Sequence, residues 1–140
     1  MKHHIYWWNL ENLFSVENDP NRSEFLAKKL RSELRGWTQA IIDKKLANLL
    51  SIIKQFNANT GPDILGICEV ENAAIVEKLA SLMSSALGRT YLIKHVESAD
   101  KMRYRHSFNL RFCIIYSRRF SVHLANYKTK CDKRFTADSS

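Results

Sequence analysis

The stretch Pro62-Asp-Ile-Leu-Gly-Ile-Cys-Glu-Val-Glu-Asn72 decides the fold of this 140-residue chain. A Pro-Asp turn opens a short apolar run over residues 64–68, and two acids on either side of Val70 close it. Apolar runs of this length between turn signals are typical of buried strands. In α/β proteins such strands are covered on both faces, and open sheets bind their ligands at the carboxyl ends of the strands. The stretch therefore predicts a buried strand that carries Glu69 to a ligand-binding edge.

The two acids of this stretch are candidates for a metal site. Packing does not explain Glu69, because carboxylates are rarely buried without a partner. Magnesium is commonly held by one or two carboxylates, with water and substrate phosphate in the other positions. Glu71 lies two residues further along and would share a strand face with Glu69, as a second ligand or as support for the first. An acid just before a helix is also favoured by the helix dipole, so a structural role for Glu71 stays open.

The segments around this strand alternate between strand and helix patterns. They predict, in order, a strand over residues 3–14 that ends near Asn9, helices over 24–34 and 38–58, the strand of residues 64–68, a helix between Asn72 and Gly88, and a strand over 91–96. The helix over 38–58 has an apolar stripe, and Lys44 and Lys45 lie off its centre as solvent-facing residues. This order of elements predicts an α/β fold.

Composition favours a soluble domain. The chain is 45% hydrophobic and 26% charged, which is ordinary for a domain with its own core. It shows no apolar stretch of membrane-spanning length and no signal-peptide pattern, so we expect a cytoplasmic location and no membrane partner. Three scattered cysteines, Cys68, Cys113 and Cys131, argue against a disulfide framework and against structural zinc. The sequence indicates no oligomeric state.

Four motifs, in this order and spacing, resemble the endonuclease/exonuclease/phosphatase superfamily, whose members have the DNase I-like fold. They are Trp8-Asn-Leu-Glu-Asn-Leu-Phe14, Gly36-Trp37 followed by Lys44-Lys-Leu-Ala47, Pro62-Asp-Ile-Leu65, and Ile67-Cys-Glu-Val-Glu-Asn72. The resemblance implies a metal-dependent hydrolase that acts on phosphoesters, such as a nuclease, phosphodiesterase or phosphatase. It implies Mg²⁺ (or Mn²⁺) as cofactor, Glu69 as its ligand, Asn9 beside Glu69 in the catalytic centre, and a phosphoester substrate, with nucleic acid as one candidate.

The resemblance also implies a domain organisation. The family fold is a four-layer α/β sandwich built from two similar halves. Residues 1–102 would form the N-terminal strand-helix-strand-helix-strand half of it, which makes the expected fold a truncated one. The family motifs that activate water and contact phosphate, Asn-His, Asp-x-Asn and Ser-Asp-His, lie further downstream in the family pattern, and none of them occurs after Asn72 in this sequence. We therefore expect an incomplete and inactive fragment of the enzyme.

Residues 103–140 are predicted to form a basic tail. Acidic and basic residues are equal in number up to Asp100, whereas from Lys101 onward ten Lys or Arg face two acids. Such charge asymmetry is typical of segments that bind nucleic acid. The alternative function is therefore a non-catalytic nucleic-acid-binding protein that contacts phosphates through the arginines of this tail: Arg103, Arg105, Arg111, Arg118 and Arg119.

A change of reading frame is a second explanation for this tail. The family pattern has Gly-Ile-Asp and a β-rich run after residue 102, whereas this chain reads Arg103-Tyr-Arg-His-Ser-Phe-Asn-Leu-Arg-Phe112. Permitted codons for this segment, read one base later, encode Gly-Ile-Asp-Ile-Ala-Leu-Ile-Tyr. On this hypothesis, residues from Tyr104 onward are out of frame and poorly ordered. On the competing hypothesis, the tail is genuine and Phe112-Cys-Ile-Ile-Tyr116 is a strand of the family fold.

Overall fold

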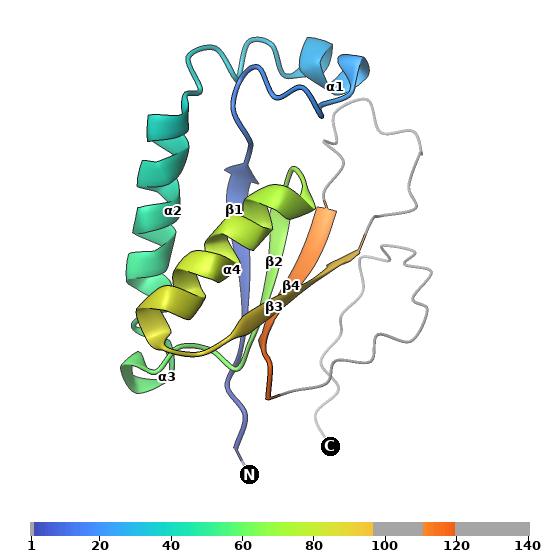
Figure 1. The fold of residues 1–140 in the computed structure, drawn as a ribbon. Coiled ribbons are helices and arrows are strands. Elements are labelled where there is room, and N and C mark those ends of the chain that lie inside the picture. The colour runs from blue at the N-terminus through green and yellow to red at the C-terminus, as the bar shows by residue number, and fades with distance from the viewer. Residues whose placement is uncertain (1, 97–110, 120–140) are drawn as a thin grey trace.

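The computed structural model describes residues 2–96 and 111–119 of the chain (Figure 1). The elements in these ranges are β1 (Ile5–Leu13), α1 (Glu24–Lys29), α2 (Gln39–Ile53), α3 (Phe56–Asn59), β2 (Ile64–Val70), α4 (Ala73–Leu87), β3 (Tyr91–Val96) and β4 (Arg111–Ser117). Strands and helices alternate through most of the chain, which confirms the predicted α/β class. No helix in the described ranges is long and apolar enough to cross a bilayer.

The four strands form one mixed sheet in the order β1-β2-β4-β3. Strand β1 runs parallel to β2, in a register that pairs Ile5 with Ile64 and Asn9 with Cys68. Strand β4 is antiparallel to both of its neighbours. The predicted central strand, β2, therefore lies inside the sheet with a neighbour on each side. Parallel pairing of β1 and β2 brings their carboxyl ends to the same edge.

Strand β4 lies within the segment predicted to be a basic tail. It pairs with β2 from Ile64↔Tyr116 to Val70↔Arg111 and with β3 along the length of that strand. Its residues Cys113 and Ile115 are fully buried. The strand that the sequence pattern predicts over residues 112–116 therefore lies within β4. The boundary of the tail and its reading frame stay predictions. The rest of the predicted tail, residues 103–110 and 120–140, lies outside the described residues.

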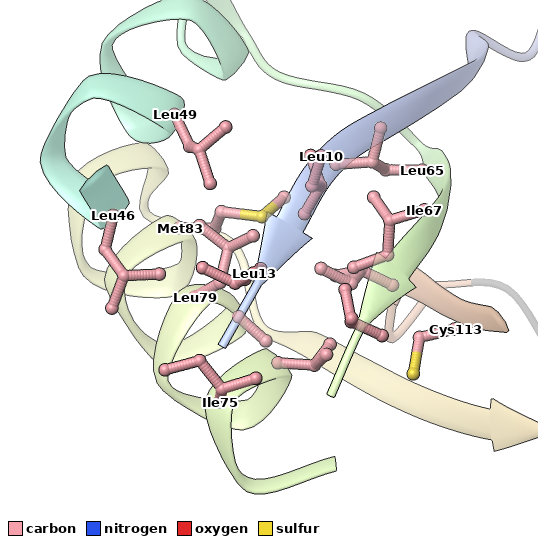
Figure 2. Packing of buried hydrophobic residues seen from close by; sticks show 14 of the residues in the cluster. Leu10, Leu13, Leu46, Leu49, Leu65, Ile67, Ile75, Leu79, Met83 and Cys113 are labelled. Carbon is pink, nitrogen blue, oxygen red and sulfur yellow. The ribbon is translucent and has the colours of Figure 1, made fainter. Parts of the chain in front are cut away.

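Helices α2 and α4 cover one face of the sheet and form the core with it (Figure 1). The predicted stripe of α2 is buried at Ile42, Leu46, Leu49 and Ile53. Figure 2 shows Leu46 and Leu49 of this stripe. They lie in one apolar cluster with side chains of α4, β1 and β2, among them Met83, Leu10 and Ile67. Burial of one such side chain stabilises a fold by about 1.5–3 kcal/mol. The packed core of α2 and α4 therefore stabilises strands β1 and β2, which carry Asn9 and Glu69.

The ends of α4 are as the sequence predicts. The Asn72 side chain accepts a hydrogen bond from the main-chain nitrogen of Ile75 at 3.0 Å, which caps the amino end. Gly88 has φ +61° and ends the helix in the left-handed region that glycine enters without strain. Local chemistry was enough to place both boundaries.

The two earlier helices are shorter than predicted. Helix α1 ends at Lys29, and Leu30 and Leu34 continue as turns whose side chains are buried against Phe14. Helix α2 ends at Ile53 instead of continuing to residue 58, and α3 follows with Asn57 and Ala58 at positive φ. Contacts with other parts of the chain, and not the local sequence, coincide with the early end of each helix.

Tyr6 on β1 accounts for the break after α2. The Phe56 ring stacks on the Tyr6 ring with 4.2 Å between their centroids. The Tyr6 hydroxyl accepts a hydrogen bond from the main-chain nitrogen of Asn57 at 3.0 Å. These contacts with a strand outweigh the helix propensity of the segment, and they redirect the chain into β2.

Candidate functional site

The predicted site residues Asn9 and Glu69 meet where the regular pairing of β1 with β2 ends, since Asn9 is the last residue of β1 that pairs before the register shift and Glu69 lies next to the last residue of β2. Strand β1 itself continues to Leu13, so the prediction that it ends near Asn9 was wrong. The Asn9 Nδ2 donates a hydrogen bond to Glu69 Oε1 at 2.7 Å, across sixty positions of sequence. Asn9 is exposed and Glu69 is half-buried, so the pair lies where solvent reaches it. The structure thus brings together the two residues to which the resemblance assigned a catalytic role.

The backbone around this pair departs from regular strand geometry. Register shifts interrupt the β1–β2 ladder between Asn9 and Leu13. Within the interrupted part, Glu11 has φ +49°, Asn12 has φ +62°, and Glu69 itself has φ +60°. Such a conformation costs a residue with a side chain about 1–3 kcal/mol, and it is found most often at functional sites. Bulges of this kind change the direction of side chains at the end of a strand.

Hydrogen bonds determine the orientation of the Asn9 amide. The main-chain nitrogen of Glu11 donates to Asn9 Oδ1 at 2.9 Å, so the other end of the amide, Nδ2, faces Glu69. Lys45 of α2 reaches the same turn and donates to the main-chain oxygens of Glu11 at 2.9 Å and Asn12 at 3.1 Å. The interpretation of Lys45 as a solvent-facing residue was therefore wrong. The sequence signal was weak, since Lys45 only borders the apolar stripe.

Glu71 faces a different environment from Glu69. Its carboxylate accepts hydrogen bonds from Arg22 Nε at 2.5 Å, from Arg22 Nη2 at 2.8 Å and from the main-chain nitrogen of Ser15 at 2.7 Å. The Glu71 and Arg22 side chains are 5% and 1% exposed. This buried ion pair supports the structural interpretation of Glu71, through an arginine that the sequence analysis did not single out. Of the two acids that close the 62–72 stretch, Glu69 is therefore the one that solvent reaches.

Glu69 supplies one carboxylate at this edge, which is the kind of ligand that magnesium takes in proteins. Glu69 Oε2 accepts no hydrogen bond from any described residue, and the Asn9 amide holds Oε1. In the described part of the chain, no three His, Cys, Asp or Glu side chains gather as a metal-binding group. Magnesium does not need such a group, because it is commonly bound through one or two carboxylates plus water and substrate phosphate.

The arginines assigned to nucleic acid are not brought together by the described structure. Arg111 pairs with Val70 at the end of β4 that adjoins the Asn9–Glu69 edge. Arg118 and Arg119 are exposed and follow the opposite end of β4. Arg103 and Arg105 lie outside the described residues. In the described part of the chain, these arginines therefore do not form one continuous phosphate-binding surface.

Comparison with known proteins places the chain in a family. Neither the curated proteins nor the solved structures gave a significant match. The sequence model of the endonuclease/exonuclease/phosphatase family matches residues 4–130, which includes β4 as well as both motifs that form the edge. The match covers most of the 140 residues and runs well past residue 102 in the reading frame as given. The chain belongs to the endonuclease/exonuclease/phosphatase family.

Proposed function

We propose that the edge formed by Asn9 and Glu69 binds a divalent metal ion, Mg²⁺ or Mn²⁺, in a centre that hydrolyses phosphoesters. The observation that supports it most is the 2.7 Å contact between Asn9 Nδ2 and Glu69 Oε1, at the place where the regular pairing of two adjacent parallel strands ends. Membership of a family of phosphoester-cleaving enzymes gives the reaction class. The irregular backbone at Glu69, with φ +60°, agrees with a residue held for function and not for stability.

The chemistry follows from the two side chains. A bound metal would stabilise the charge that develops on a phosphate oxygen during hydrolysis. Glu69 supplies a carboxylate with one oxygen, Oε2, that no described donor contacts. Asn9 holds the other oxygen and so restricts the rotation of the carboxylate. Hydrogen-bonding partners that orient a metal ligand commonly change metal affinity or activity by about 10–100-fold when they are removed.

Metal binding is the property we expect this chain to show most directly. After Asn72 the sequence lacks the family motifs that activate water and contact phosphate, so binding and turnover must be measured separately. The substrate class is a phosphoester, and nucleic acid is one candidate within it. Nucleic-acid binding through the basic tail stays a prediction, since no contact of the described residues favours it.

The decisive measurement is the affinity of the full chain for Mn²⁺, determined by electron paramagnetic resonance or by calorimetry. Glu69→Gln keeps the size of the side chain and removes its charge, so we expect Mn²⁺ affinity to fall about tenfold or more. Glu77→Gln is the matched control, because Glu77 is an exposed acid on α4 and is not one of the residues that form this edge. Equal Mn²⁺ affinity in wild type and Glu69→Gln would refute the proposal.

Hydrolysis of a simple phosphodiester such as bis(p-nitrophenyl) phosphate is the second measurement. Turnover that needs Mn²⁺ and is lost in Glu69→Gln would extend the proposal to catalysis by this chain. Metal binding at Glu69 without turnover would agree with the expectation of an incomplete enzyme. Salt-sensitive binding of DNA that persists in Glu69→Gln would support the basic-tail alternative instead.

A further inference from the structure

Lys45 connects the helix layer to the functional edge of the sheet. Its Nζ donates to the main-chain oxygens of Glu11 at 2.9 Å and of Asn12 at 3.1 Å. Both of these residues have positive φ, and they form the part of β1 that leaves the ladder with β2. Neither residue is paired in the register of β1 with β2, which passes from Asn9 to Leu13. The ammonium therefore supplies donors that the irregular turn otherwise lacks.

The same turn orients Asn9. The nitrogen of Glu11 donates to Asn9 Oδ1 at 2.9 Å, and this leaves Asn9 Nδ2 to donate to Glu69 at 2.7 Å. Each step in the series from Lys45 to Glu69 is a hydrogen bond of ordinary length. A change in the position of the Glu11 peptide would move the Asn9 amide, and with it the partner of the Glu69 carboxylate.

The environment of Lys45 indicates a specific role for its charge. The side chain is half-buried, and its Nζ lies 5.8 Å from the centre of the Trp37 ring. Burial lowers the pKa of the Lys45 ammonium, and the Glu11 and Glu69 carboxylates oppose this shift without cancelling it. Partial burial of a charge is unfavourable unless hydrogen bonds and opposite charges compensate it. Lys44, the next residue on α2, is exposed and bears no such cost.

We propose that Lys45 is a positioning residue of the metal-binding edge, which fixes the Glu11–Asn12 turn and, through it, the amide of Asn9 against Glu69. The consequence for metal binding rests on the proposed function. The consequence for the Asn9 amide does not, because the hydrogen bonds are present whatever the site binds. Two separate measurements can therefore test the two statements.

The first measurement follows the side-chain NH₂ pair of Asn9 in ¹⁵N-labelled full chain by nuclear magnetic resonance. The loss of this pair in Asn9→Asp assigns it. Lys45→Met keeps the aliphatic stem and removes the cation, so we expect the Asn9 pair to shift while the far-ultraviolet circular dichroism stays that of wild type. Lys44→Met is the matched control and should leave the pair in place. Lys45→Arg keeps a cation that can donate to both carbonyls, and it should restore most of the wild-type position.

The second measurement is Mn²⁺ affinity, which we expect to fall about tenfold in Lys45→Met and to stay unchanged in Lys44→Met. An unshifted Asn9 pair in folded Lys45→Met would overturn the proposal, as would a shift of equal size in Lys44→Met. If Lys45→Met does not fold, the neutral Lys45→Gln takes its place with the same two readings. If Glu69→Gln leaves Mn²⁺ affinity unchanged, the proposed function fails and the Asn9 pair alone decides the role of Lys45.

Discussion

Replacement of Arg22 by methionine tests the buried ion pair that fixes the loop after β1. The variant removes four hydrogen bonds that the Arg22 guanidinium donates. Two go to the Glu71 carboxylate, one goes to the main-chain oxygen of Glu17, and one goes to the main-chain oxygen of Ser15. The Glu71 carboxylate would keep the main-chain nitrogen of Ser15 as its described donor. Removal of one partner from a buried ion pair costs about 3–5 kcal/mol, because the remaining charge stays buried. With side chains only 1% and 5% exposed, this pair belongs in that class.

Urea unfolding, monitored by circular dichroism, measures how much free energy of unfolding the Arg22→Met variant loses. Small domains have a denaturant slope of about 1–3 kcal/mol per molar urea, so a loss of about 4 kcal/mol lowers the midpoint by about 2 M. Arg31→Met is the control, because Arg31 is exposed and lies just after α1, whereas Arg22 lies just before that helix. Substitutions at such surface positions usually change stability by about 0.5 kcal/mol or less.

A double variant separates the pair from the loss of a single charge. In Arg22→Met with Glu71→Leu no charge is left buried, so we expect most of the stability to return. A loss below about 1 kcal/mol in Arg22→Met would be the size expected of an exposed pair. That result would refute the conclusion that Glu71 is occupied by Arg22, and it would return Glu71 to the candidates for metal binding.

Two further predictions concern the backbone at the site and the acid side of the stability curve. Because Glu69 has φ +60°, Glu69→Gly should be about 1 kcal/mol more stable than Glu69→Ala in the same urea assay, and equal stability would mean that the position is unstrained. Burial raises the pKa of Asp63, but hydrogen bonds from Arg89 and the His4 main chain hold it below its ordinary value of 3.8. Stability from this carboxylate is therefore present above pH 3.8 and lost as pH falls through its folded value, so Asp63→Asn should lose less stability than wild type between about pH 5 and pH 3.

Elements with local causes were predictable from the sequence. The β2 strand follows from an apolar run between turn signals, and the buried stripe of α2 follows from helical spacing. Asn72 and Gly88 bound α4 through side-chain and backbone chemistry within a few residues. The pairing of Asn9 with Glu69 was expected from the resemblance, and their contact agrees with it.

Features that depend on distant partners were not predictable in the same way. Lys45 and the Glu11 carbonyl are 34 positions apart, and Arg22 and Glu71 are 49 apart. The sequence around a long basic side chain is the same whether that side chain is hydrated or donates a hydrogen bond to a distant group. Lys45 and Arg22 therefore could not be told apart from ordinary surface residues. The break after α2 has the same origin, because the Tyr6 hydroxyl that helps to cause it lies on another element. The place of β4 was uncertain because a sequence pattern predicts a strand but not its neighbours.

The strand order has a consequence for the synthesis of the protein. Strand β4 follows β3 in the chain, yet it lies between β2 and β3 in the sheet. On a ribosome, β3 emerges before the strand with which it pairs. Tyr91 then links β3 to earlier parts of the chain, since its nitrogen donates to Ser84 Oγ at 3.0 Å and its hydroxyl to the Pro62 carbonyl at 2.8 Å. Until residues 111–117 emerge, β2 and β3 each expose an unpaired edge of the kind that chaperones and other nascent chains bind.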